Sequence, residues 1–208
     1  MKKKIVISTL IVLSFLMITV LGISPSNAAD KKEFLIGSVG AMSGPGAMLG
    51  KNLRIGVEFA VEEINKTGGI NGMKVRAIFR DDEADPTKSL TLVRELVEKE
   101  KINAFIGPTN TTCAKAIQPY LVAKKIIQLN GGTTGTALIN PKEFPYSFRT
   151  HINDKDQGIF LVQEAIENGY KRIAVAHDTS ALGMGVQADM KEVLKSRGMT
   201  AAAFTTYN

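Results

Sequence analysis

Two short runs of hydroxyl-bearing residues have the chemistry to hold a small anion. One is Thr109-Asn110-Thr111-Thr112, and the other is Gly131-Gly132-Thr133-Thr134. Each run follows a short apolar segment that is predicted to be a strand, and the first run also leads into a predicted helix. Hydroxyls, free backbone N–H groups and the positive end of a helix dipole together suit a carboxylate. Ordinary capping and turn formation would explain one such run, so the pair of runs is what favours a site.

A glycine-rich segment, residues 44–50, lies between a predicted strand and a predicted helix, where phosphate-binding loops occur. The dinucleotide-binding pattern requires glycine where Leu49 stands. The phosphate-loop pattern requires glycine at Pro45 and Ser or Thr at Asn52. Both patterns fail, so we interpret the segment as a turn that packs tightly or admits a ligand.

Catalytic motifs are weak in this sequence, which has neither a G-x-S-x-G nor an H-E-x-x-H pattern. His151 and His177 are far apart in the chain. The pair His177-Asp178 could bind metal or exchange protons, but hydrogen bonding within a loop is the more common role. Asp81-Asp82 could act as general acid and base, although the acidic residues that follow favour a solvated acidic turn. We therefore expect that the protein is not an enzyme.

The segments that carry these residues alternate between short apolar runs and longer stretches with helical spacing. This alternation is typical of a parallel α/β sheet. Strands are predicted at residues 34–39, 74–79, 102–106, 126–129 and 146–149. Helices are predicted at residues 51–65, from Pro86 after the capping residue Asp85, and up to about Lys124. The polar loop 130–141 would then lie at the carboxyl ends of the strands, where open α/β sheets bind ligands.

Beyond Thr150 the pattern restarts, with helices at about 156–167 and 185–197 and strands at 172–177 and 200–206. We interpret residues 30–150 as one lobe, which carries the ligand head-group site, and residues 151–208 as the start of a second lobe. Two strands are too few to bury both faces of a sheet. We therefore expect the chain to be an incomplete amino-terminal portion of a longer protein.

The first residues predict export. Three lysines after Met1 precede an uncharged apolar run of 19 residues, Ile5 to Ile23, and the small residues Ser26 and Ala28 follow. This pattern is typical of a signal peptide, here residues 1–29. A retained membrane anchor is the alternative, because the run approaches the ~20 residues that span a bilayer. No cysteine follows that could carry a lipid, so we expect a free periplasmic protein.

Charge and cysteine content exclude several classes of protein. The chain has 26 basic and 20 acidic residues, and 23 basic residues remain without the three leader lysines, which leaves a net charge of +3. Because the two signs are interleaved, we expect no nucleic-acid partner. Cys113 is the only cysteine, so no disulfide can form within the chain and no thiol cluster can bind metal. We expect no metal and no organic cofactor.

Several motifs taken together resemble the periplasmic branched-chain amino-acid-binding proteins of ABC importers, over nearly all of residues 34–208. The matching motifs are Ala41-Met42-Ser43-Gly44-Pro45, Val61-Glu62-Glu63-Ile64-Asn65, Gly68-Gly69-Ile70-Asn71-Gly72, Asp81-Asp82-Glu83-Ala84-Asp85-Pro86, Ile106-Gly107-Pro108, Phe148-Arg149-Thr150 and Asp156-Gln157-Gly158. The resemblance implies a two-lobe type I periplasmic-binding-protein fold with parallel sheets flanked by helices. It also implies a monomer that binds a small amino-acid-like ligand between its lobes and delivers it to an ABC importer permease in the membrane.

The resemblance also implies roles for individual residues. Thr111 falls where the family binds the ligand carboxylate, and Gly132 falls where a backbone carbonyl receives the ammonium group. Thr134 falls where an amide and a hydroxyl hold the head group, and Thr133 stands between these two positions. These residues coincide with the two threonine runs, which indicate a carboxylate site without the resemblance.

Other positions depart from the family. Leu49 and Leu182 stand where members that bind amino acids often place aromatic side chains against the ligand. The family's frequent disulfide is absent, because Ala84 and Asn110 occupy its places. Branched-chain amino acids, aromatic acids, amides and short carboxylates are therefore all open as ligands. The ligand-sensing domain of a membrane receptor and, less strongly supported, a secreted hydrolase are the alternatives to a transport protein.

Overall fold

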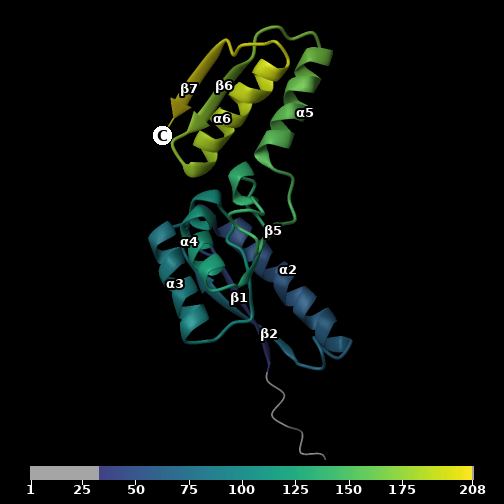
Figure 1. Ribbon diagram of the computed structural model, residues 1–208, viewed down its shortest axis with the longest axis vertical. Coiled ribbons are helices and arrows are strands. Elements are labelled where there is room, and N and C mark those ends of the chain that lie inside the picture. The colour runs from purple at the N-terminus through teal and green to yellow at the C-terminus, as the bar shows by residue number, and fades with distance from the viewer. Residues whose placement is uncertain (1–32, 208) are drawn as a thin grey trace, which may run out of the picture. The chain divides into compact units, whose positions relative to one another are not determined.

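The computed structural model describes residues 33–207, which form two β-sheets, each made of parallel strands, with flanking helices (Figure 1). The larger sheet has five strands in the order β2-β1-β3-β4-β5, and the smaller sheet pairs β6 with β7. The strands are β1 (Phe34–Gly40), β2 (Val75–Asp81), β3 (Ala104–Ile106), β4 (Ile127–Asn130), β5 (Ser147–Arg149), β6 (Ala174–Asp178) and β7 (Ala203–Tyr207). The predicted α/β class with parallel sheets is confirmed.

Helices cover both faces of the five-stranded sheet. In Figure 1, α3 and α4 lie on one face and α2 lies on the other. The helices are α2 (Ala47–Lys66), α3 (Pro86–Glu98), α4 (Thr111–Ala123), α5 (Asp154–Glu167) and α6 (Ala181–Ser196), and a short 3-10 helix, η1 (Thr136–Leu138), lies in the loop after β4. The main core forms where α3 and α4 pack on the sheet, with Val39, Phe105, Leu96 and Ile117 fully buried. This core holds the strand ends that carry the candidate site.

Side-chain caps fix where the helices begin. Asp85 accepts a hydrogen bond from Lys88 N at 2.7 Å, and Pro86 follows at the first helical position. This arrangement confirms the predicted start of α3. Asn110 caps α4 in the same way, with Oδ1 accepting from Cys113 N at 2.8 Å. Thr111 is therefore the first residue of α4.

Two predicted helix starts were wrong. The helix predicted from residue 51 begins at Ala47, and its first turn packs so closely that a Cβ on Gly50 would lie 1.9 Å from the carbonyl oxygen of Ala41. The helix predicted from residue 185 begins at Ala181, because Ser180 caps it by accepting from Gly183 N at 3.1 Å. Glycines weaken the helical signal in both first turns, although they are what permits the close packing.

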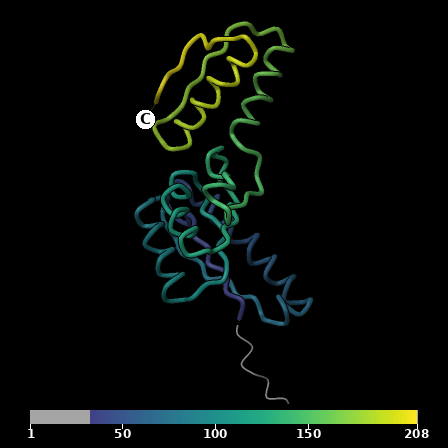
Figure 2. Tube along the Cα trace, in the orientation of Figure 1, coloured from purple at the N-terminus to yellow at the C-terminus, as the bar shows by residue number. Residues whose placement is uncertain are grey.

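The second sheet has its own small core. The chain runs from β6 through α6 to β7, so the two strands are parallel (Figure 2). Val175 of β6 packs with Val162 of α5 and with Met190, Val193 and Leu194 of α6. Within residues 33–207, no helix combines the length and the apolarity needed to cross a bilayer. The predicted signal peptide lies outside the described residues.

Candidate ligand-binding site

The two threonine runs meet at the carboxyl ends of β3 and β4. Thr111, only 2% exposed, accepts a hydrogen bond at its Oγ1 from the backbone N–H of Gly135 at 3.3 Å. A hydroxyl that accepts one hydrogen bond still has its own hydrogen to donate. Thr111 also opens α4, where backbone N–H groups have no carbonyl partner within the helix. The position therefore combines a hydroxyl donor with the positive end of a helix dipole, which suits an anion.

The second run packs directly on the first. A Cβ on Gly132 would lie 3.3 Å from the Cα of Thr109, so the two backbones touch. Thr133 is 1% exposed, and within the described part of the chain its hydroxyl has no hydrogen-bond partner. The carbonyl oxygen of Thr134 accepts from Arg149 Nη1 and from Asp154 N, both at 3.0 Å. The structure thus brings Thr111, Gly132, Thr133 and Thr134 into one pair of packed loops.

A pocket of about 530 Å³ adjoins these loops, between α2 and the five-stranded sheet. It includes Gly132 and Leu49, and Leu49 is 53% exposed. The pocket is lined mainly by apolar side chains and glycines, namely Leu49, Leu53, Gly56, Val57, Ala60, Ile106, Leu129, Gly131 and Gly132, with Asn52, Thr109, Thr150 and His151 as polar members. Such a pocket suits an apolar group attached to a polar head. Thr111, Thr133 and Thr134 do not line it.

Leu182 stands apart from the other predicted site residues. It is the second residue of α6 and is 37% exposed. It does not line the pocket that contains Leu49 and Gly132. The structure therefore places five of the six predicted ligand contacts at or beside the loops after β3 and β4, and Leu182 is not among them. The ligand-binding role of all six residues stays a prediction.

A buried polar network lies beneath the loop after β4, and sequence reasoning missed it. Gln118 of α4 donates from Nε2 to the Leu138 carbonyl at 2.6 Å and to Ser147 Oγ at 2.8 Å. Ser147 in turn donates to Gln128 Oε1 at 3.1 Å, and Gln128 Nε2 donates to Asn130 Oδ1 at 3.0 Å. All four polar side chains are buried. Satisfied networks of this kind rigidify a core, so the network holds the loop in place.

Sequence reasoning also missed two residues that touch the loop itself. Arg149 binds the carbonyls of Thr134 and Gly135. A ring nitrogen of His151, Nε2, lies 2.8 Å from the carbonyl oxygen of Gly131. The Phe148-Arg149-Thr150 motif was the available signal, but it did not reveal which backbone groups it contacts.

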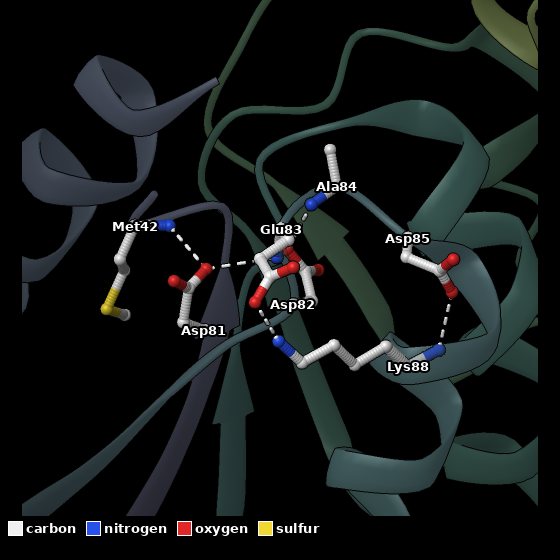
Figure 3. Close-up of polar contacts among 7 residues, drawn as sticks. All are labelled: Met42, Asp81, Asp82, Glu83, Ala84, Asp85 and Lys88. Atoms are coloured by element: carbon white, nitrogen blue, oxygen red, sulfur yellow. Dashed lines mark hydrogen bonds and ion pairs between the residues drawn. The ribbon is translucent and has the colours of Figure 1, made fainter. Parts of the chain in front are cut away.

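The acidic pair Asp81-Asp82 at the end of β2 is structural, and its interpretation as a solvated turn was wrong for Asp82. Asp82 is fully buried, where it accepts from Ser89 Oγ at 2.7 Å and from Ala84 N at 3.0 Å. Asp81 accepts from Met42 N at 2.8 Å (Figure 3). Desolvation acts to raise the pKa of Asp81, but hydrogen bonds from Ser43, Met42 and Glu83 outweigh it and hold the pKa at about 2. Both carboxylates fasten loops through these hydrogen bonds, and the low pKa of Asp81 makes it a poor proton donor or acceptor near neutral pH.

The other candidate reactive groups are also occupied or shielded. His177 is buried, with Nδ1 donating to the Asp178 carbonyl at 2.8 Å and Nε2 accepting from Gln187 at 2.8 Å. The hydrogen-bonding role expected for His177 is confirmed, although its partners lie in β6 and α6 rather than in a loop. Cys113 is fully buried, and burial raises its pKa to about 11, so it is a poor nucleophile. Among residues 33–207, no group of three His, Cys, Asp or Glu side chains is placed to hold a metal ion.

The chain resembles known proteins in sequence. Residues 33–208 match the family model described as periplasmic binding protein. The Leu/Ile/Val-binding protein homolog 3 of Brucella melitensis is 29% identical over 174 residues, 83% of this chain and 47% of that protein. The Leu/Ile/Val-binding protein of Escherichia coli is 28% identical over 180 residues, 86% of this chain and 48% of that protein. The chain spans about half the length of the curated relatives it matches.

Solved structures share the fold. The branched-chain amino acid transporter substrate binding protein of Streptococcus pneumoniae, in complex with isoleucine, superposes with a TM-score of 0.74 at 24% identity, covering 85% of this chain and 50% of that one. A solute binding protein of an ABC transporter from Rhodopseudomonas palustris, in complex with 3,4-dihydroxybenzoic acid, superposes with a TM-score of 0.73 at 25% identity, covering 84% and 47%. The parallel strands, the loops at their carboxyl ends and the family match agree, and the chain belongs to the periplasmic binding protein family.

Proposed function

We propose that the protein captures a small carboxylate, foremost a branched-chain amino acid, for an ABC importer. The observation that carries this proposal is the buried hydrogen bond from Gly135 N to Thr111 Oγ1, which joins two segments that border an apolar pocket through Thr109 and Gly132. Its acceptor position leaves the Thr111 hydroxyl hydrogen to be donated to a ligand. The combination provides a polar anchor and an apolar cavity at one edge of the sheet.

The head-group site is built for negative charge. In the proposed complex the Thr111 hydroxyl donates to the ligand carboxylate, and the first turn of α4 contributes its helix dipole. Thr134 contributes its amide and hydroxyl, the carbonyl of Gly132 receives the ammonium group, and Thr133 supports the loop. Hydrogen bonds to a charged group are stronger than neutral ones, so this end of the ligand provides most of the specificity for acids.

The pocket governs the rest of the ligand. Its apolar lining, with Leu49 at one side, suits an aliphatic side chain or a small ring. Leu182 would contact the ligand from the second lobe, residues 151–208. The matched proteins include binders of Leu/Ile/Val and of 3,4-dihydroxybenzoic acid. Leucine, isoleucine and a hydroxybenzoate are therefore the probes with the best support.

Binding without catalysis fits the reactive side chains of the described residues. His177 and Cys113 are buried and do not line the pocket. His151 does line it, but its Nε2 is bound to the Gly131 carbonyl. The partner of the ligand-bound protein would be the membrane permease of the importer. The protein would reach this permease as a monomer in the periplasm, after removal of residues 1–29.

Mass spectrometry of the native amino terminus tests export. A start at Ala29 or Asp30 is expected, and an intact Met1 would favour a membrane-anchored sensor instead.

Isothermal titration of the full-length protein tests the proposed function. The probes are L-leucine, L-isoleucine and 4-hydroxybenzoate, with D-glucose as a solute that has no carboxylate. We expect saturable binding of at least one acid and none of glucose. Chelation of divalent metals should leave the affinity unchanged. Absence of binding for all three acids would overturn the proposal.

A further inference from the structure

Arg149 at the end of β5 reaches back to the ligand loop. Its Nη1 atom donates to the carbonyl oxygens of Thr134 and Gly135, each at 3.0 Å. Arg149 pairs with Asn130 in the register between β5 and β4, so its backbone is fixed by the sheet. The neighbouring Asn130 side chain is buried and donates to the Phe148 carbonyl at 3.1 Å. The guanidinium therefore projects from a rigid strand end onto a loop.

One peptide unit connects Arg149 to Thr111. The carbonyl of the peptide that joins Thr134 to Gly135 accepts from Arg149, and the N–H of the same peptide donates to Thr111 Oγ1 at 3.3 Å. A trans peptide is planar, and its C=O and N–H point in opposite directions. Holding the carbonyl therefore aims the N–H at Thr111. A charged donor on the carbonyl also polarises the peptide and strengthens its N–H as a donor.

We infer that Arg149 is a positioning residue for ligand binding, acting through the Thr134–Gly135 peptide to orient the Thr111 hydroxyl toward the ligand carboxylate. This inference deepens the proposed function and rests on it. With the Thr111 oxygen engaged as acceptor, its hydrogen is left to face the ligand. Without Arg149 the Thr134 carbonyl keeps only the Asp154 N donor, so the peptide is held less firmly and the orientation of the Thr111 hydroxyl is less fixed.

Close packing between Gly135 and Thr111 supports this coupling of Arg149 to Thr111. A Cβ on Gly135 would lie 2.5 Å from Thr111 Cγ2 and 3.2 Å from its Oγ1, so the loop and Thr111 are already in contact. Asp154 N donates to the same Thr134 carbonyl at 3.0 Å, which places the start of α5 against this peptide too. The peptide is thus held on its carbonyl side by two donors and on its amide side by one acceptor.

The first test needs no ligand. Amide hydrogen exchange of Gly135, measured by NMR on the full-length protein, should rise about tenfold in Arg149→Met, the size expected for a weakened hydrogen bond. The amide of Val39, in the interior strand β1, should be unchanged. Arg76→Met is the matched control, because Arg76 is an exposed arginine on β2 that pairs with Glu33 away from the site. Unchanged exchange at Gly135 in Arg149→Met would overturn the inference.

The second test is a double-mutant cycle of Arg149→Met with Thr111→Val, titrated with whichever of L-leucine, L-isoleucine or 4-hydroxybenzoate binds the wild type. Arg149→Met alone should weaken binding about tenfold or more. In a protein that already carries Thr111→Val, the same change should weaken binding much less, because the hydroxyl that Arg149 positions is no longer there. Additive losses would show a purely structural role and contradict the inference. If Arg149→Met does not fold, Arg149→Lys keeps the charge and serves in both tests. If no probe binds the wild type, the proposed function fails, while the exchange result still decides whether Arg149 orients the peptide.

Discussion

The backbone N–H of Gly135 donates to Thr111 Oγ1 at 3.3 Å, although the two residues lie 24 positions apart in the chain. This bond joins the start of α4 to the loop after β4. It also decides the direction of the Thr111 hydroxyl, because the oxygen accepts and the hydrogen is left to donate.

Replacing Thr111 by valine keeps the shape of the side chain and removes its hydroxyl. Binding of the cognate acid should weaken by about 1.5 to 3 kcal/mol, the usual value for a hydrogen bond to a charged group. That loss corresponds to roughly ten- to a hundredfold in affinity by calorimetry. Thr134→Val should also weaken binding without abolishing it, since backbone amides remain.

His177→Ala is the control for the threonine variants, because among residues 33–207 His177 bonds only to Asp178 and Gln187. It should lower stability and leave affinity near the wild-type value. Normal binding by both valine variants together with weak binding by His177→Ala would place the site elsewhere.

Adding a methyl group to Gly135 should damage the site. In Gly135→Ala the new Cβ would lie 2.5 Å from Thr111 Cγ2, so one of the two segments must move. Overpacking of this kind typically costs about 1 to 3 kcal/mol of stability, and it should also weaken ligand binding. Gly185→Ala in α6 is the matched control, because a Cβ there meets no atom of the described residues within 4 Å. Gly185→Ala should leave the free energy of unfolding in urea unchanged or raise it by up to about 1 kcal/mol. If Gly135→Ala and Gly185→Ala changed this free energy equally, the predicted clash would be contradicted.

Removing the Ser147 hydroxyl should destabilise the protein. Ser147→Ala leaves Gln118 and Gln128 each without one buried partner. Unsatisfied buried groups cost about 1 to 3 kcal/mol, which the midpoint of urea unfolding would report. The control Ser196→Ala removes a hydroxyl at the exposed end of α6 whose one hydrogen bond within the described residues goes to the Val193 carbonyl. It should change stability by less than about 0.5 kcal/mol. A Ser147→Ala protein as stable as this control would show that the network is not needed.

The sequence predicted the parts of the fold that depend on local pattern. Apolar runs located the strands to within a few residues, and Asp85 followed by Pro86 located the start of α3. Two threonine runs at neighbouring strand ends indicated where a carboxylate site would form. These features are encoded by residues close together in the chain, so periodicity and capping chemistry reveal them.

Features that depend on tertiary contacts could not be predicted in the same way. Burial of Asp82 requires Ser89, which reaches it only once α3 packs on the sheet. Arg149 bonds to the carbonyls of Gly135 and Thr134, which lie 14 and 15 positions before it in the chain. Contacts at this separation produce no periodic pattern in the sequence. Gln118 and Gln128 are polar residues in a core, and polarity alone would place them at the surface.

Asp81 should make stability depend on pH in the acid range. Its pKa lies at about 2 in the fold, below the ordinary 3.8. A lowered pKa contributes stability that is fully present above the unfolded value and is lost as pH falls through the folded value. The stability gap between the wild type and Asp81→Asn should therefore be constant from about pH 7 to about pH 4 and should narrow below that. A gap that stays constant down to about pH 3 in urea unfolding would show that Asp81 is not held by Met42 and Glu83 as described.

The most direct measurement compares each candidate acid with its matched alcohol on the full-length protein. The pairs are L-leucine with L-leucinol and 4-hydroxybenzoate with 4-hydroxybenzyl alcohol, titrated by calorimetry against the wild type and Thr111→Val. If Thr111 and the loop after β4 hold a carboxylate, the acid of the cognate pair binds the wild type at least about a hundredfold more tightly than its alcohol, and this preference shrinks about tenfold or more in Thr111→Val. Equal binding of an acid and its alcohol, or a preference that Thr111→Val leaves unchanged, would contradict the carboxylate site.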